Sequence, residues 1–342
     1  MEIFKLGDFM HKIRNLVFEG GGIHGIAYLG ILQYLYENNM MENVKRVAGT
    51  SAGAITACIT SFNLPFLEVK NIADSLDFKK VPQKYDSKVI DIIPHEVKLY
   101  LDKIYGDYAC VNRLVKNYGW FSSEYFYQWL KTHIESQFDK SKKAPPYTFA
   151  DFNNPSIHKD NRPFFDLYVI GTDISYKASK VFSYTTTPDM EVAEAVRISM
   201  SIPLFFEAIT VDDAFEASSN LKNIYSDGGI MRNYPINIFD YPTINGKTIY
   251  RFNPQTLGAR FKGHTKYKEV NNFLDFILNL FLCFSKIQQD SYNENTQDID
   301  RSIDIDTGEI SSVNFNVSPG DEAYNFLYTQ GYKAAENYFM NK

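Results

Sequence analysis

The sequence has few cysteines, no long apolar run and no surplus of basic residues, and each shortage excludes a class of protein. Its three cysteines, Cys58, Cys110 and Cys283, are too few for a disulfide framework, and their spacing matches no zinc motif. We expect all three to be buried as small apolar side chains in a reducing compartment. Lys and Arg total 35 against 41 for Asp and Glu, a net charge of −6. Nucleic acid is therefore not an expected partner.

The chain also lacks the patterns of a signal peptide and of a transmembrane helix. Charged residues recur through the first fifteen positions, which leaves no apolar stretch for a signal peptide. The densest apolar run, residues 273–284, is too short to span a bilayer and contains Asp275 and Asn279. We expect a cytoplasmic protein or one peripheral to a membrane. Export as an effector, by a machinery that reads no signal peptide, remains open.

Strand-like apolar runs alternate with segments of helical period, which predicts an α/β fold with a mainly parallel sheet and crossover helices. We expect strands at residues 14–18, 44–48, 166–171, 180–184, 223–226, 247–252 and 312–316. We expect helices at residues 26–38, 52–60, 66–76, 96–117, 123–138, 188–200 and from 318 towards 340. The whole chain, 1–342, is predicted to be a single domain. It comprises a core at about 13–258, a helical, lid-like insertion at about 79–146 and a C-terminal helical extension at about 265–342.

A glycine-rich run between the first predicted strand and helix could serve three kinds of site. The run is Gly20-Gly21-Gly22-Ile23-His24-Gly25. A dinucleotide site would need an acidic residue at the end of the second strand, where residues 48–51 contain none. A Walker-type phosphate loop would need a following Gly-Lys-Ser/Thr, which is also missing. An oxyanion hole fits better, because consecutive glycines expose backbone N–H groups and the helix behind them adds donors. A tight turn without a ligand is the plain alternative.

A second motif follows the second predicted strand and is typical of a nucleophilic serine. Gly49-Thr50-Ser51-Ala52-Gly53 matches G-x-S-x-G and leads into a helix of small residues. A sharp turn between strand and helix would present the Ser51 hydroxyl, and Gly49 and Gly53 would relieve crowding on either side. Ser51 is therefore the candidate nucleophile.

A serine nucleophile needs a base within hydrogen-bond reach, and two residues are candidates. His264 is the one histidine late enough in the chain to serve as in an α/β-hydrolase, but its polar surroundings favour a surface loop. Asp227 ends a predicted strand and is followed by Gly228 and Gly229. We expect it at the carboxyl ends of parallel strands, where functional loops gather, and we prefer it as the base. A simple Asp-Gly turn is its non-catalytic alternative.

Together the three motifs resemble the patatin-like phospholipase family, whose fold is shared with cytosolic phospholipase A2. Ser51 follows Gly22 by 51 − 22 = 29 residues, which matches the family's spacing between its glycine loop and its serine. Segment 199–205 resembles the family's helix-to-Pro segment before the aspartate strand, and segments 253–258 and 303–307 resemble downstream parts of bacterial members. The likeness is weakest at residues 79–146.

The resemblance implies a three-layer α/β/α fold and a Ser51–Asp227 dyad without histidine. Its oxyanion hole would be formed by N–H groups around Gly20, Gly21, Gly22 and Ile23. The implied reaction hydrolyses acyl esters of a phospholipid or another acyl lipid through an acyl-enzyme, with no metal and no cofactor. A Ser-His-Asp esterase using His264 and a catalytically silent lipid-binding protein of the same fold are the alternatives. An activating protein partner is not specified by the sequence.

Two features of the sequence concern contacts with a lipid substrate and with a membrane surface. Family members commonly carry Arg or Lys where this chain has His24, so His24 is either a pH-dependent substrate contact or a spacer. Aromatic residues make up 15% of the chain and gather in two segments that could contact a membrane surface. The first lies in the insertion and contains Tyr118, Trp120, Phe121, Tyr125, Phe126, Tyr127 and Trp129. The second is 273–284, whose helical spacing favours a core stripe instead.

Overall fold

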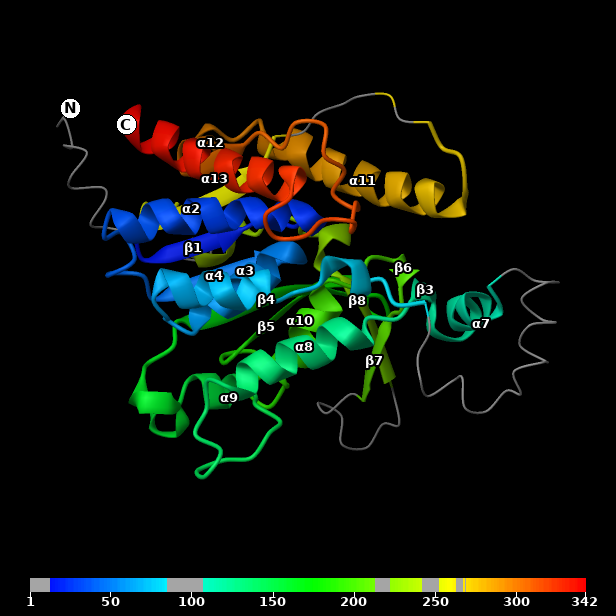
Figure 1. Cartoon of the computed structure of the whole chain (residues 1–342), viewed down its shortest axis with the longest axis horizontal. Coiled ribbons are helices and arrows are strands. Elements are labelled where there is room, and N and C mark those ends of the chain that lie inside the picture. The colour runs from blue at the N-terminus through cyan, green and yellow to red at the C-terminus, as the bar shows by residue number, and fades with distance from the viewer. Residues whose placement is uncertain (1–12, 85–106, 213–221, 242–251, 263–266, 268) are drawn as a thin grey trace, which may run out of the picture.

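The computed structural model describes residues 13–84, 107–212, 222–241, 252–262, 267 and 269–342, and a mixed sheet forms its centre (Figure 1). Its strands are β1 (Asn15–Phe18), β2 (Arg46–Thr50), β4 (Asp166–Asp173), β5 (Ala178–Ser183), β7 (Ile209–Asp212), β8 (Lys222–Asp227), β9 (Thr256–Phe261) and β10 (Ser302–Ile305). Their order is β10-β9-β1-β2-β4-β8-β7, and β5 pairs with β4 outside this path. The strands from β10 to β4 are parallel. The predicted α/β class with a mainly parallel sheet is confirmed.

The strand that carries Asp227 departs from the parallel pattern. β8 runs antiparallel to β4, with Asp227 opposite Gly171, so the expected parallel strand at Asp227 is wrong. The register still suits the predicted dyad, because Thr50 of β2 pairs with Ile170 on the other side of β4. Ser51 and Asp227 therefore leave the sheet at the same level, on either side of β4.

Helices cover the two faces of the sheet unequally. The thicker layer contains α2 (Ile26–Glu37), α3 (Ala52–Ser61), α4 (Phe66–Asp74), α8 (Glu124–Glu135), α10 (Val192–Ser199) and α13 (Glu322–Met340). Leu16, Phe18 and Val47 belong to the large core on this side. On the opposite face, Val17 and Ala48 pack against the short helix η6 (Ile236–Phe239). Burial on both faces explains why residues 16–18 of β1 are all apolar.

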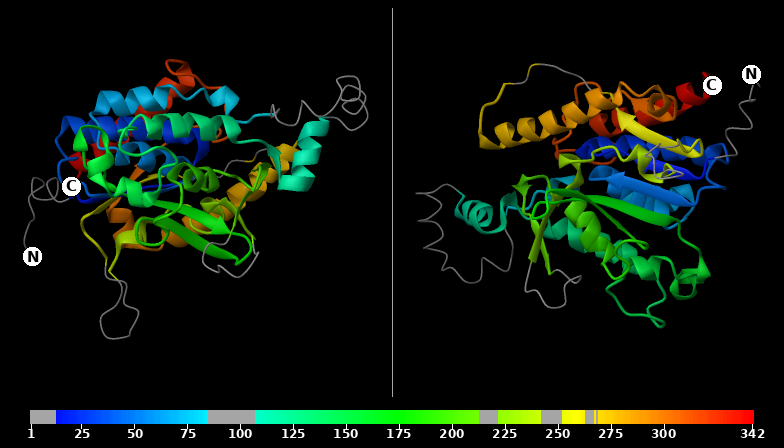
Figure 2. Two further views of the ribbon diagram at one scale, coloured as in Figure 1. Left: turned by 90° about the horizontal axis from the view of Figure 1, so that it is seen from below. Right: turned by 180° about the vertical axis from the view of Figure 1, so that it is seen from behind.

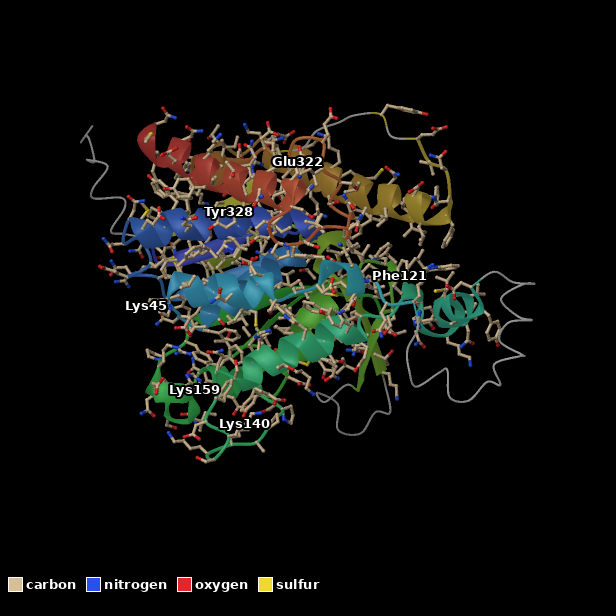
Figure 3. The ribbon with its side chains drawn as sticks, viewed as in Figure 1. Lys45, Phe121, Lys140, Lys159, Glu322 and Tyr328 are labelled. Carbon is tan, nitrogen blue, oxygen red and sulfur yellow. The ribbon has the colours of Figure 1, made fainter. Side chains whose placement is uncertain are left out.

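The C-terminal part of the chain is built into the core. β9 and β10 extend the parallel sheet, and the core boundary predicted near residue 258 falls inside β9. Helix α13 lies directly on α2, where a Cβ on Gly30 would come within 2.1 Å of the Tyr328 carbonyl. Tyr328 lies at the seam between these helices (Figure 3), and its hydroxyl donates a hydrogen bond to Gln33 Oε1. Residues 302–340 therefore complete the sheet and its helical cover.

One predicted strand differs from the structure, because residues 312–316 form an irregular segment. Most of the strand predicted at 247–252 lies outside the described residues. β9 and β10 were not predicted, because charged residues interrupt both apolar runs. Arg260 and Asp304 form an ion pair across these neighbouring strands, which lets the charges lie within the sheet.

The insertion contains α7 (Tyr108–Asn117) and β3 (Gly119–Phe121), and β3 pairs with β6 (Leu204–Phe206). The first part of the helix predicted at 96–117 lies outside the described residues. Helix α8 buries Phe126, Trp129 and Leu130 in the large core. The expectation that Phe126 and Trp129 could contact a membrane surface is therefore wrong, because α8 packs on α10.

The remaining helices are α9 (Phe149–Phe152), α11 (Phe273–Tyr292) and α12 (Thr296–Asp300). The N-terminal half of α11 reaches past the end of the sheet, at the same end of the molecule as α7 (Figures 1 and 2). Several large apolar side chains of α11 are exposed, so the core stripe expected at 273–284 is wrong. Cys58 and Cys110 are buried as predicted, but Cys283 on α11 is exposed. In the described parts of the chain, no helix combines the length and apolarity needed to span a bilayer.

Candidate active site

Ser51 occupies the sharp turn between β2 and α3. Its backbone has φ of 53° and ψ of −122°, a conformation that is costly for any residue with a side chain, by about 1–3 kcal/mol. A Cβ on Gly49 would lie 2.1 Å from the Gly53 carbonyl, and one on Gly53 would lie 2.3 Å from the Phe18 carbonyl. Both flanking positions therefore require glycine. The strained turn is held by its surroundings and fixes the direction of the Ser51 hydroxyl.

A second serine fixes the Ser51 backbone. The Ser51 N–H donates to Ser199 Oγ at 2.8 Å, and Ser199 Oγ donates in turn to the Ile170 carbonyl at 2.5 Å. Ser199 ends α10 and so links that helix, β4 and the turn. Sequence reasoning singled out segment 199–205 but missed this role, because a buried serine at a helix end has no distinctive pattern.

Asp227 lies at the end of β8 and is fully buried. Its Oδ1 accepts a hydrogen bond from the Gly229 N–H at 2.7 Å, whereas Oδ2 has no partner among the described residues. Burial raises the pKa of the Asp227 carboxyl to about 7, opposed by the Gly229 N–H and by the neighbouring Ser51 hydroxyl. The structure thus brings the two predicted catalytic residues together. A buried carboxylate oxygen without a partner is a candidate proton acceptor.

The glycine loop lies beside the same serine, where a Cβ on Gly20 would be 3.2 Å from Ser51 Cβ. The Gly20 N–H donates to the Asn233 carbonyl at 3.0 Å, and the Ile23 N–H donates to the Ser312 carbonyl at 2.8 Å. Gly20 and Ile23 therefore anchor the loop and have no N–H to offer a ligand. Gly21 and Gly22 are half-buried, and within the described residues no hydrogen bond from either N–H is found. Of the four backbone N–H groups predicted for the oxyanion hole, those of Gly21 and Gly22 therefore stay as candidates.

Glu19, just before the loop, joins several surrounding segments. Its Oε2 accepts from the Phe261 N–H at 2.8 Å, and its Oε1 accepts from Asn233 Nδ2 at 3.2 Å and from Gln289 Nε2 at 3.3 Å. Burial raises the pKa of Glu19 to about 7. Asn233 Nδ2 also donates to the Gly20 carbonyl at 3.1 Å. Sequence reasoning missed Glu19 and Asn233, although a carboxylate at the end of a buried strand was a visible signal.

Helix α11 borders the loop that follows Asp227. Gln288 Nε2 donates to the Gly229 carbonyl at 2.8 Å, and Gln288 Oε1 accepts from the Asn233 N–H at 2.7 Å. The Phe281 ring is so close that a Cβ on Gly229 would lie 2.8 Å from its Cζ. The apolar run predicted as a core stripe is thus one wall of the candidate site.

Comparison with known proteins agrees with this arrangement. Residues 16–240 match the family described as patatin-like phospholipase. The chain belongs to this family. Membership supports hydrolysis of lipids, although the matched region ends before β9, α11 and Ser312.

Individual relatives of this patatin-like phospholipase are distant. The chain is 26% identical over 331 residues to the uncharacterized protein R571 of Acanthamoeba polyphaga mimivirus, covering 92% of this chain and 90% of that one. It is 27% identical over 226 residues to the probable lipid hydrolase 463L of Invertebrate iridescent virus 6, covering 66% of this chain and 62% of that protein's length. The crystal structure of VipD from Legionella pneumophila is similar with a TM-score of 0.56 at 21% identity, covering 96% of this chain and 67% of that one. That likeness concerns the fold alone.

His24 lies in the glycine loop of this patatin-like phospholipase but faces the protein. Its Nε2 donates to the Ile310 carbonyl at 2.7 Å, and its ring meets the Phe261 ring edge-on at 5.3 Å. Burial lowers the pKa of the imidazole below its usual value. The ring is therefore neutral at pH 7 and offers no cation, which favours the spacer role over the charged contact. The alternative base, His264, lies outside the described residues.

An apolar cavity opens beside the glycine loop and the serine turn, between α2 and α3. Part of its open space is continuous with solvent. The residues lining it include Gly22, Gly25, Leu29, Ala52, Ile55, Ile59, Val69, Ala73 and Trp129. Gly22 of the glycine loop and Ala52, the residue after Ser51, both line the cavity, so it reaches the two motifs of the candidate site.

Proposed function

We propose that the protein is a lipid acyl hydrolase of the phospholipase A type that uses Ser51 as nucleophile and Asp227 as base. One observation carries the proposal: Ser51, at a strained turn, neighbours a buried Asp227 whose Oδ2 has no other partner among the described residues. Membership of the patatin-like phospholipases supports a lipid ester as substrate. No histidine is required in this scheme.

The first half-reaction forms an acyl-enzyme. Ser51 Oγ attacks the ester carbonyl carbon while Asp227 Oδ2 accepts the hydroxyl proton. Negative charge develops on the carbonyl oxygen, which the N–H groups of Gly21 and Gly22 and the N-terminus of α3 stabilise. The carbon–oxygen bond of the ester then breaks, and the alcohol or lysophospholipid leaves with the proton from Asp227.

The second half-reaction releases the fatty acid. Water attacks the acyl carbon, Asp227 again accepts a proton, and the same N–H groups hold the oxyanion. Collapse of the intermediate frees the fatty acid, and Ser51 regains its proton from Asp227. The cavity between α2 and α3 holds the acyl chain in both steps, because its walls are apolar along the first turns of both helices.

The proposed substrate is a phospholipid or another acyl lipid, and it fixes where the enzyme works. Such a lipid resides in a membrane surface, so we propose a cytoplasmic or peripheral protein that visits this surface.

The test compares Ser51→Ala and Asp227→Asn with wild type. Each change should lower hydrolysis of phosphatidylcholine at least 10³-fold, and a fluorophosphonate probe should label wild type at Ser51 by mass spectrometry. Ser61→Ala, the same change at the far end of α3, is the matched control and should retain activity. Activity that survives Asp227→Asn but is lost in His264→Ala would assign a Ser-His-Asp esterase. Absence of both labelling and hydrolysis would indicate a silent lipid-binding protein.

A further inference from the structure

Helix α11 carries an apolar row on its outer face. Phe273, Phe276, Leu280, Phe284 and Ile287 are 49%, 55%, 44%, 39% and 68% exposed. They recur at intervals of three, four, four and three residues, which places them in one line along the helix. We call these five residues the α11 stripe. A row of this length on a soluble protein indicates a contact surface.

The other faces of α11 have different partners. Ile277, Leu278 and Ser285 are buried against the rest of the protein. A polar flank contains Asp275, Asn279, Lys286 and Asp290. Lys286 forms an ion pair with Asp290, so the flank carries no surplus of positive charge. The helix thus has a fixed inner face, a polar flank and an apolar stripe.

Residues on the inner face of α11 form hydrogen bonds with the segments that carry the proposed catalytic residues. Gln288 holds the Gly229 carbonyl in the Asp227 loop, and Gln289 donates to Glu19 just before the glycine loop. At the other end of the helix, the ring of Phe273 lies 6.4 Å from the ring of Trp120 in β3, which extends the apolar surface to a second element. The α11 stripe is therefore carried by the same helix that contacts both loops of the candidate active site.

We propose that the α11 stripe docks on the surface of a lipid bilayer and thereby turns the Ser51–Asp227 site towards its substrate. The inference rests on the proposed function, because a lipid surface is the partner that would also supply the substrate at this position. Apolar insertion drives the docking, and the polar flank has no net basic charge to attract anionic headgroups. Neutral phosphatidylcholine vesicles should therefore suffice, and salt should have little effect.

The experiment measures vesicle flotation in the Ser51→Ala background, so that hydrolysis plays no part. The stripe variant Phe276→Ser/Leu280→Ser/Phe284→Ser should bind phosphatidylcholine vesicles at least ~10-fold more weakly than its parent, with an unchanged circular dichroism spectrum. The matched control changes three exposed apolar residues elsewhere, Leu67→Ser/Ile174→Ser/Met340→Ser, and should bind like the parent. Equal binding by the stripe variant and the control would overturn the proposal. Binding that requires anionic lipid and disappears in 0.5 M salt would overturn it too.

A fluorescent probe on the exposed Cys283 provides a second readout, since Cys58 and Cys110 are buried. An environment-sensitive dye at Cys283 should shift to shorter wavelength with phosphatidylcholine vesicles. The same dye on Leu67→Cys, in a Cys283→Ser background, should not shift. An unshifted Cys283 dye on vesicle-bound protein would contradict docking by α11. A dimer in light scattering that becomes a monomer in the stripe variant would assign the stripe to a second copy of the chain. Fluorophosphonate labelling of Ser51 without vesicles tests the proposed function separately.

Discussion

Gln288 Nε2 donates a hydrogen bond of 2.8 Å to the Gly229 carbonyl and so joins α11 to the loop that positions Asp227. The same side chain accepts the Asn233 N–H, and Asn233 in turn contacts the glycine loop through the Gly20 carbonyl. The Gln288 side-chain amide thus connects a helix outside the matched family region to both loops of the candidate site.

Replacing this amide should loosen the Asp227 loop. In Gln288→Leu the Gly229 and Asn233 groups lose their partner, so we expect kcat to fall about 10-fold, the equivalent of one strong hydrogen bond. Fluorophosphonate labelling of Ser51 should slow in parallel. Gln128→Leu, which removes an exposed amide paired with Glu124, is the control and should leave both rates unchanged. A Gln288 variant as fast as wild type would remove α11 from the positioning of the site.

The pH dependence of hydrolysis should follow the buried carboxyl. Burial raises the pKa of Asp227 to about 7, and a base acts only when deprotonated. Consequently kcat/KM should rise with pH up to about 7 and fall about tenfold per unit below it. Burial also raises the pKa of Glu19 to about 7, so Glu19→Gln is the necessary comparison and should keep the same profile. A flat wild-type profile between pH 5 and 8 would speak against Asp227 as the base.

The buried Asp227 carboxyl should lower the free energy of unfolding at neutral and alkaline pH. Asp227 has a folded pKa of about 7, above its usual 3.8, so the folded state retains a proton that the unfolded chain releases between these values. Its contribution to the free energy of unfolding therefore falls as pH rises from 4 to 7 and is constant above that. Asp227→Asn should be more stable than wild type at pH 8, by on the order of 4 kcal/mol, and equally stable near pH 4. Urea unfolding at both pH values measures this; a less stable variant at pH 8 would refute it.

The glycine loop should tolerate no side chain at its third glycine. Gly22 has φ of +55°, and a Cβ there would lie 2.0 Å from the Ser312 carbonyl. Gly22→Ala should displace the Gly21 and Gly22 N–H groups and lower kcat about 10²-fold. Gly320→Ala is the matched control, since Gly320 also has a positive φ of +89° but open space around it. It should cost about 1 kcal/mol of stability and no activity. Comparable loss of kcat in both variants would indicate general destabilisation.

The apolar cavity should set the preferred acyl length. Ala73 of α4 lines it, so Ala73→Leu should fill part of the space. We expect the ratio of kcat/KM for long-chain to short-chain nitrophenyl esters to fall about 10-fold. Ala144→Leu, the same change on an exposed loop, should leave the ratio unchanged. An unaltered ratio in the Ala73 variant would place the acyl chain elsewhere.

Much of the candidate site could be predicted from the sequence, because most of its residues lie close together in the chain. Strand, glycine loop, helix, strand and serine turn follow one another within residues 14–60, where periodicity and glycine spacing are informative. Asp227 was predicted correctly as a neighbour of Ser51, but for a partly wrong reason, since β8 enters antiparallel. β8 is antiparallel to both β4 and β7, and the residues around Asp227 contain no signal of this strand direction.

Features that depend on distant contacts could not be predicted. The charged residues Arg260 and Asp304 prevented β9 and β10 from being predicted as buried strands, because the two charges form an ion pair only when the strands lie side by side. The helical spacing of apolar residues in α11 predicted the helix correctly, but it wrongly predicted that these residues are buried. Periodicity alone does not show what covers an apolar face. The contributions of Ser199, Asn233 and Gln288 arise from single polar atoms that meet across long stretches of chain.

The contacts of the Ser312 carbonyl predict how truncation or proteolysis of the chain affects the proposed activity. It accepts the Ile23 N–H and leaves no room for a side chain on Gly22, yet it lies some seventy residues beyond the matched family region, since 312 − 240 = 72. A fragment ending near residue 258 would contain every recognisable motif and still lack this support, half of β9 and all of α11. We therefore expect the smallest active fragment to be larger than the matched family region. Proteolysis between α11 and α13 should abolish the proposed activity while leaving Ser51 and Asp227 in place.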